Sequence, residues 1–120
     1  MIELGKVSIV NEQSIVECRN KIRDLALHFD FSPVPAARIA TASSEICLSQ
    51  LSTGEASFVE FYLDNISAQP GVLLVFKGVH GDFASARFEL LFDRFLQESV
   101  DDKFDIKAFR FLPVVNSHPT

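Results

Sequence analysis

Residues 38–51, RIATASSEICLSQL, constrain the fold of this chain more than any other stretch. Their apolar side chains recur at helical spacing, which predicts a helix that begins near Pro35 and ends near Leu51. Serine and alanine dominate the middle of this helix, and such small side chains allow it to pack closely against a sheet. One carboxylate, Glu45, lies among them. We therefore expect a closely packed helix that carries a single acidic group.

The same reading of hydrophobic periodicity predicts the other elements of the chain. The first helix has Ser14 as its expected N-cap, with Glu17 completing a capping box. The third helix has Asp82 as its expected N-cap. The expected helices lie at residues 15–29, 35–51 and 82–99. The expected strands lie at residues 6–10, 56–64, 72–76 and 106–114.

This order of elements predicts an α+β fold. We expect a two-layer α/β sandwich, in which a mixed β-sheet carries three helices on one face and leaves its other face open. The chain has 120 residues, which is enough for one core without disulfides or metal. A single domain is expected at residues 1–114, followed by a flexible tail at residues 115–120.

Charge and cysteine usage exclude several classes of function. The chain has 11 Lys and Arg against 16 Asp and Glu, a net charge of −5, so binding to nucleic acid or to an anionic membrane surface is not expected. Cys18 and Cys47 lie far apart and match no C-x-x-C spacing, so we expect two buried thiols in a reducing compartment. The first residues include acidic side chains and no long apolar run, so we expect neither a signal peptide nor a membrane span there. A cytoplasmic location is the expectation.

The aromatic content of the chain is unusual. Twelve residues are Phe, none is Trp, and 48% of the chain is hydrophobic, which is more apolar surface than a small core is expected to hide. Strand alternation places Phe58 and Tyr62 on the face opposite to Phe61. Together with Phe109 and Phe111, they predict an exposed apolar surface that binds a protein partner or forms a homodimer.

Two helical segments and the strand pair after them resemble a known family. These are residues 14–19 (SIVECR), residues 38–46 (RIATASSEI), and the strands with the loop after Phe76. They resemble the ATPase superfamily of DNA gyrase, histidine kinases and MutL, and within it the anti-sigma-factor serine kinases. The resemblance covers most of the chain. It implies a histidine-kinase-like ATPase fold with ATP and magnesium as the family's cofactors.

The family's first nucleotide motif is a Glu followed four residues later by an Asn on the same helix face. In the family the Asn binds the magnesium ion on the ATP phosphates, and the Glu positions the attacking group. Glu45 matches this Glu, so the resemblance makes it the remnant of a catalytic base. Ser49 stands at the Asn position, and its hydroxyl is a weaker ligand. Gln50 has an amide but points about 100° away around the helix.

The family's other two motifs are rich in glycine. In D-x-G-x-G, the Asp accepts the adenine amino group, but neither Gly78 nor Gly81 can be placed on a glycine of this motif with an Asp at the required position. The phosphate-binding G-x-G-x-G loop would follow a mobile lid, yet no glycine follows Gly81. Both the lid and this loop are therefore missing. We expect no cofactor and no metal; if a nucleotide still bound, Ser49, Gly78 and Gly81 would contact it.

The resemblance and the missing motifs together predict a regulatory, non-catalytic interaction module in bacterial signalling. The family's partners are sigma factors, STAS-domain antagonists or phosphatases. One alternative is a divergent ATP-dependent serine/threonine kinase that uses Glu45 as its base, with Ser49 or Gln50 helping a metal. Another is a self-association domain built on the open sheet face. For Glu45 itself, the simpler interpretation is either a helix-surface carboxylate or a carboxylate satisfied by a nearby hydroxyl such as that of Thr41.

Overall fold

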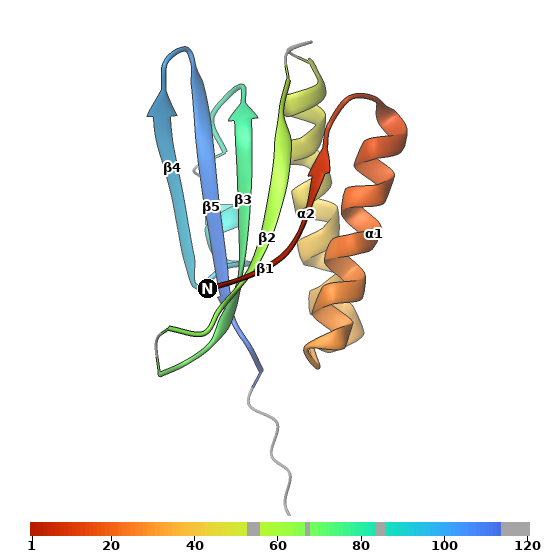
Figure 1. Ribbon diagram of the computed structural model, residues 1–120, viewed down its shortest axis with the longest axis vertical. Coiled ribbons are helices and arrows are strands. Elements are labelled where there is room, and N and C mark those ends of the chain that lie inside the picture. The colour runs from red at the N-terminus through yellow and green to blue at the C-terminus, as the bar shows by residue number, and fades with distance from the viewer. Residues whose placement is uncertain (53–55, 67, 84–85, 114–120) are drawn as a thin grey trace, which may run out of the picture.

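The computed structural model describes residues 1–52, 56–66, 68–83 and 86–113 as an α+β domain, which confirms the predicted class (Figure 1). The strands are β1 (Ile2–Ser8), β2 (Phe58–Asp64), β3 (Gly71–Val79), β4 (Arg94–Val100) and β5 (Lys103–Phe111). The helices are α1 (Glu12–His28), α2 (Pro33–Ser52) and α3 (Ala86–Glu89). Within the described ranges, none of the helices combines the length and hydrophobicity needed to cross a membrane. The predicted tail at residues 115–120 lies outside the described residues.

The five strands form one sheet in the order β1-β2-β3-β5-β4, and every neighbouring pair is antiparallel. The prediction of a mixed sheet was therefore wrong. A parallel pair needs a crossover connection of about a dozen residues or more, usually a helix. The predicted helix at residues 82–99 would have supplied such a crossover before the last strand. Instead, β4 and β5 form a hairpin.

The third helix was the largest error of the sequence analysis. Only Ala86–Glu89 is helical, and Arg94–Val100 is strand β4. Helical and strand periodicities both place residues i and i+4 on one side, so Phe88 and Phe92 fit either pattern. Asp101 and Asp102 form the turn of this hairpin and are the sequence signal for it. Val100 pairs with Lys103 across the turn, and Asp101 has a φ of 56°. Asp tolerates this left-handed conformation better than most residues, which suits a two-residue turn.

The N-cap of α1 is Asn11, three residues before the Ser14 that the capping-box pattern predicted. The Asn11 side-chain oxygen accepts a hydrogen bond from the Ser14 backbone N–H at 2.9 Å and another from the Ser14 hydroxyl at 3.0 Å. Asn caps a helix as well as Ser does, and the earlier start gives the helix another turn. Ser14 is consequently buried in the first turn of α1.

A Schellman motif ends α1 and turns the chain into α2. Asp30 takes the left-handed position with a φ of 70°, and its N–H donates to the Leu27 carbonyl at 3.1 Å. The Phe31 N–H donates to the Ala26 carbonyl at 2.9 Å, and its ring is buried. Pro33 then occupies the first turn of α2, where no backbone donor is needed. The two helices thus form an antiparallel hairpin.

Helices α1 and α2 lie together on one face of the sheet (Figure 1). The alternation predicted for β2 is confirmed: Val59 and Phe61 point to the helices and are fully buried, whereas Phe58, Glu60 and Tyr62 on the other face are half-buried. The close packing expected of α2 is also confirmed. Its buried small side chains are Ala36, Ala40, Ala42, Ser43 and Cys47.

The two cysteines meet where α1 packs on α2. Cys47 Sγ donates to Cys18 Sγ at 3.6 Å, and both residues are fully buried free thiols. The hydrogen bond with Cys18, together with burial, raises the pKa of the Cys47 thiol. A neutral buried thiol is a poor nucleophile and a poor metal ligand. The prediction of two buried thiols is confirmed.

Candidate functional site

Glu45 lies on the exposed side of α2 and forms an ion pair with Arg87 of α3. Arg87 Nη2 donates to Glu45 Oε2 at 2.5 Å, and the two side chains are 67% and 42% exposed, respectively. Of the two simpler interpretations of Glu45, the structure agrees with the helix-surface carboxylate, and the partner is Arg87 rather than the Thr41 hydroxyl. At this exposure the pair contributes about 0–1 kcal/mol, so it orients the carboxylate rather than holding the fold together.

Ser49 stands at the position where the family's motif has its metal-binding Asn. Its hydroxyl donates a hydrogen bond to the His80 carbonyl and accepts one from the His80 N–H at 3.1 Å. Both bonds go to the backbone that follows β3. The hydroxyl therefore ties α2 to this loop, and the two bonds fix its orientation toward the backbone of residue 80.

Gln50 is turned away from Glu45 and into the interior, as its helical position predicts. It is fully buried, and its Nε2 donates to the Phe58 carbonyl at 3.0 Å and to the Lys77 carbonyl at 2.7 Å. Phe58 and Lys77 are cross-strand partners at the end of β2 and β3. One side chain of α2 thus binds both central strands, which is a structural role.

Gly78 and Gly81 have positive φ values of 76° and 101°, respectively. Glycine adopts this backbone region without strain, and other residues rarely do. Gly78 lies where the pairing of β3 with β5 shifts register between Phe76 and Val79. A methyl group on Gly78 would come within 3.2 Å of the Ser57 Cβ. The backbone therefore accounts for both glycines without a nucleotide.

An open groove runs along α2 beside the Glu45–Arg87 ion pair. The side chains that line it come from α2 and from the segment of α3 and its exit. They are Ala37, Arg38, Thr41, Ala42, Glu45, Arg87 and Leu91. Two guanidinium groups, of Arg38 and Arg87, and the single carboxylate of Glu45 line the groove, so its lining carries a net positive charge.

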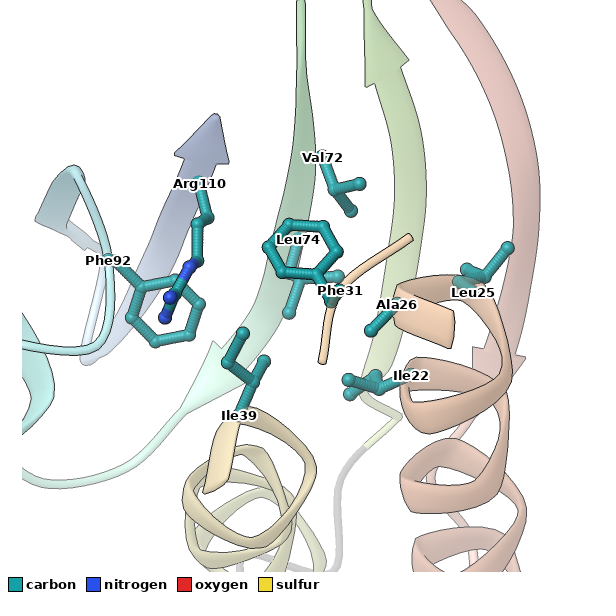
Figure 2. Close-up of a pocket in the computed structure, with 9 residues that line it drawn as sticks. All are labelled: Ile22, Leu25, Ala26, Phe31, Ile39, Val72, Leu74, Phe92 and Arg110. Carbon is teal, nitrogen blue, oxygen red and sulfur yellow. The ribbon is translucent and has the colours of Figure 1, made fainter. Parts of the chain in front are cut away.

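A second pocket is small, partly open and mainly apolar, and it lies between the helices and the sheet (Figure 2). Figure 2 shows Phe31, Ile39, Leu74 and Phe92 around it, with the Arg110 guanidinium at its side. Arg110 Nη1 donates to the Leu91 carbonyl at 2.9 Å, and the guanidinium lies 5.5 Å from the centre of the Phe31 ring. The cavity of about 20 Å³ holds about one water molecule, which excludes an organic ligand.

All four predicted interface residues lie on the sheet face opposite the helices, with Phe58 at one end of β2 and the other three toward the opposite end. Cross-strand pairing sets Tyr62 beside Leu73, Leu73 beside Phe109, and Phe109 beside Arg94 in one row. Phe111 lies edge-on to Phe109, with ring centres 5.1 Å apart. Phe109 is nevertheless 5% exposed, because its neighbours cover it. The rings of Phe58, Tyr62 and Phe111 are the more accessible part of this surface.

Charged side chains are interleaved with these rings. Lys6 Nζ lies 3.8 Å from the centre of the Phe58 ring, and the Arg94 guanidinium lies 5.3 Å from that of Phe109. The Tyr62 hydroxyl donates to Glu60 Oε2 at 2.8 Å, and this hydrogen bond raises the pKa of Tyr62. Lys77 and Asp105 pair at 2.9 Å, which raises the pKa of Lys77. The open face is therefore a mixed aromatic and charged surface.

The structure thus separates the predicted site residues into two groups. Glu45 and Ser49 lie on α2, and Gly78 and Gly81 lie at the end of β3 and in the loop after it. The four aromatic residues lie on the open face. Sequence reasoning missed Arg87 as the partner of Glu45, since the two are far apart in the chain and no local pattern links them. The role of Gln50 had a signal: it is a polar residue on the apolar side of its helix.

No protein-family model matches this chain, and no curated protein matches it either.

Proposed function

We propose that this chain is a regulatory protein–protein interaction module that resembles an anti-sigma-factor serine kinase without its nucleotide site. Its partner is a protein of bacterial signalling, such as a sigma factor, a STAS-domain antagonist or a phosphatase. The partner docks on the open face of the sheet. The proposal adopts the histidine-kinase-like ATPase fold that the sequence resemblance implies, and the α+β architecture with a helical hairpin on one sheet face is compatible with it.

The observation that carries the proposal is the composition of the open face. Aromatic rings of β2 and β5 stand half-buried on a sheet face that no described helix or strand covers. Partly exposed Phe and Tyr beside Arg and Lys are typical of protein interfaces, where rings supply apolar area and the cations supply specificity. Apolar surface of this kind, bordered by charged side chains, is typical of a site that binds another protein.

The state of the family's ligand positions supports the absence of catalysis. The Glu45 carboxylate is paired with Arg87, and the Ser49 hydroxyl is bonded to the backbone of residue 80. The Gln50 amide binds two strand carbonyls inside the core. Magnesium or ATP phosphates bound through Ser49 and Gln50 would disturb the hydrogen bonds that hold α2 to the loop after β3 and to the sheet. The Glu45 carboxylate would have to exchange its weak ion pair with Arg87 for the metal ion.

Tyr62→Glu is expected to weaken binding of the purified partner by about 30-fold or more, since a carboxylate replaces a ring at the centre of the docking surface. Calorimetric titration with purified sigma-factor, STAS-domain and phosphatase proteins from the organism that encodes this chain measures the change in affinity. Gln13→Glu is the matched control, because it adds the same charge at an exposed position of α1. Equal affinity of wild type and Tyr62→Glu would contradict the docking surface.

The alternative function, a divergent serine/threonine kinase that uses Glu45 as its base, is separated from the interaction module by a second titration. We expect no heat of binding when ATP with Mg²⁺ is added to the purified chain. Micromolar binding that Glu45→Ala abolishes would instead support the kinase. Phosphorylation of a STAS-domain protein by the wild-type chain would also overturn the proposal.

A further inference from the structure

Strand β4 is an edge of the sheet, and none of the other described strands pairs with its outer side. In Figure 1 it is the outermost strand on the side away from α1. It pairs with β5 one residue to one, from Arg94↔Phe109 to Val100↔Lys103, without a bulge. Among the described residues, no backbone hydrogen bond reaches the outer side of β4. Such a regular edge presents its free N–H and C=O groups as a template for pairing.

The opposite edge, β1, is protected in a way that β4 is not. The pairing of β1 with β2 shifts register between Glu3 and Gly5, and Gly5 has a φ of 138°. The ammonium group of Lys21 lies where a side chain on Gly5 would stand. A bulge and a nearby lysine are common devices against edge-to-edge pairing. The chain blunts one edge of its sheet and leaves the other straight.

The side chains of β4 on the open-face side are complementary to a second copy of themselves. They are Arg94, Leu96, Glu98 and Val100, of which Leu96 is 49% and Val100 45% exposed. A positive residue thus stands two places before an apolar residue, and a negative residue stands two places after it. An antiparallel copy reverses this order, so each charge meets its opposite.

We infer that two copies of this chain pair through β4, antiparallel, with Leu96 on the two-fold axis. In this register Leu96 faces Leu96 of the second copy, and Arg94 faces Glu98 on both sides of the axis. Opposite charges directly across a strand pair stabilise it, and like charges destabilise it. The interface is isologous, as a two-fold dimer requires.

Other symmetric registers are less favourable. Paired residues must share a face of the sheet, so the axis must pass through one residue and its own copy. An axis at Gln97 sets Leu96 against Glu98 and leaves Arg94 without a charged neighbour. An axis at Glu98 sets two carboxylates against each other. The Leu96 register alone combines the apolar pair with both charge pairs.

This dimer goes beyond the proposed function, because it uses the sheet edge and leaves Tyr62 free. Two five-stranded sheets become one continuous sheet, and their open faces join into one surface. Each dimer would then present two docking surfaces side by side. A partner that is itself dimeric could engage both at once, which raises its apparent affinity by avidity.

Charge exchange tests the register in the full chain. Sedimentation velocity of wild type over a wide concentration range should show a monomer–dimer equilibrium. Arg94→Glu and Glu98→Arg, each alone, should weaken dimerisation about tenfold or more, since attraction becomes repulsion twice in the symmetric interface. The double variant Arg94→Glu with Glu98→Arg should restore the dimer. If the double variant dimerises as wild type does, misfolding is excluded as the cause of the weaker dimerisation in each single variant.

Cysteine cross-linking tests the axis directly. Leu96→Cys should form a covalent dimer under mild oxidation, because residues directly opposite in antiparallel strands have Cβ atoms about 5 Å apart. Val100→Cys is the control, since its two copies lie about 27 Å apart in this register. The native cysteines are buried and do not interfere. A strict monomer, equal cross-linking of both variants, or a dimer that Tyr62→Glu dissociates would overturn the inference.

Discussion

Gln50→Leu is expected to lower the free energy of unfolding by about 2–4 kcal/mol. Leucine keeps the volume of the side chain but removes its two donors. The carbonyls of Phe58 and Lys77, which now accept from Gln50 Nε2 at 3.0 and 2.7 Å, would lose these bonds in a buried site. Urea unfolding followed by far-UV circular dichroism measures the loss.

The matched control for Gln50→Leu is Gln13→Leu. Gln13 lies exposed in the first turn of α1, so the same chemical change should alter the free energy of unfolding by less than about 0.5 kcal/mol. If both variants unfold at the same urea concentration as wild type, Gln50 does not join α2 to the sheet. In that case the Gln50 amide would also be available to a ligand.

Gly71→Ala is expected to destabilise the chain by about 2–3 kcal/mol through overpacking. The φ of Gly71 is not among the positive values, so the need for glycine here is one of space. A Cβ on Gly71 would stand 2.3 Å from the Phe109 ring and 2.6 Å from the Arg110 carbonyl oxygen. The ring and the backbone of β5 would both have to move. Thermal unfolding and urea titration measure the effect.

A second substitution separates the two contacts of Gly71. In the double variant Gly71→Ala with Phe109→Val, the smaller side chain removes the ring contact but leaves the contact with the backbone of β5. The double variant should therefore lose less free energy of unfolding, relative to wild type, than the two single variants lose when their losses are added. Strict additivity would show that the Phe109 ring does not rest on Gly71. Binding of the partner should fall in Gly71→Ala, because the displaced ring belongs to the docking surface.

Local patterns predicted most of the fold correctly. The helical spacing around Ile39 and Ile46 and the two prolines before it located the helical hairpin. Alternation in β2 separated Phe58 and Tyr62 from Phe61, because successive side chains of a strand point to opposite faces wherever the strand lies. The four predicted interface residues share one face for this reason. These features depend on neighbours in the chain, so the sequence is sufficient to predict them.

The region after residue 81 was predicted poorly because its pattern is ambiguous. Phe88, Phe92 and Phe95 recur at intervals that suit one side of a helix. The neighbours Phe95 and Leu96 also suit a strand, in which they point to opposite faces of the sheet. The hairpin with β5 decides between the two, since it satisfies the backbone of β4 with partners further along the chain, from Arg94↔Phe109 to Val100↔Lys103. The packing of Phe88 on Phe95, with ring centres 6.1 Å apart, then closes the end of the core.

The sequence by itself determined the α+β class, the closely packed second helix, the buried thiols and the aromatic face, because each follows from the periodicity or chemistry of adjacent residues. Only the tertiary structure decided the partners of the polar side chains. The pairing of Glu45 with Arg87, of Ser49 with the backbone of residue 80, and of Gln50 with two strands joins positions far apart in the chain. Which strand forms the open edge was likewise decided by the order in which the strands pair.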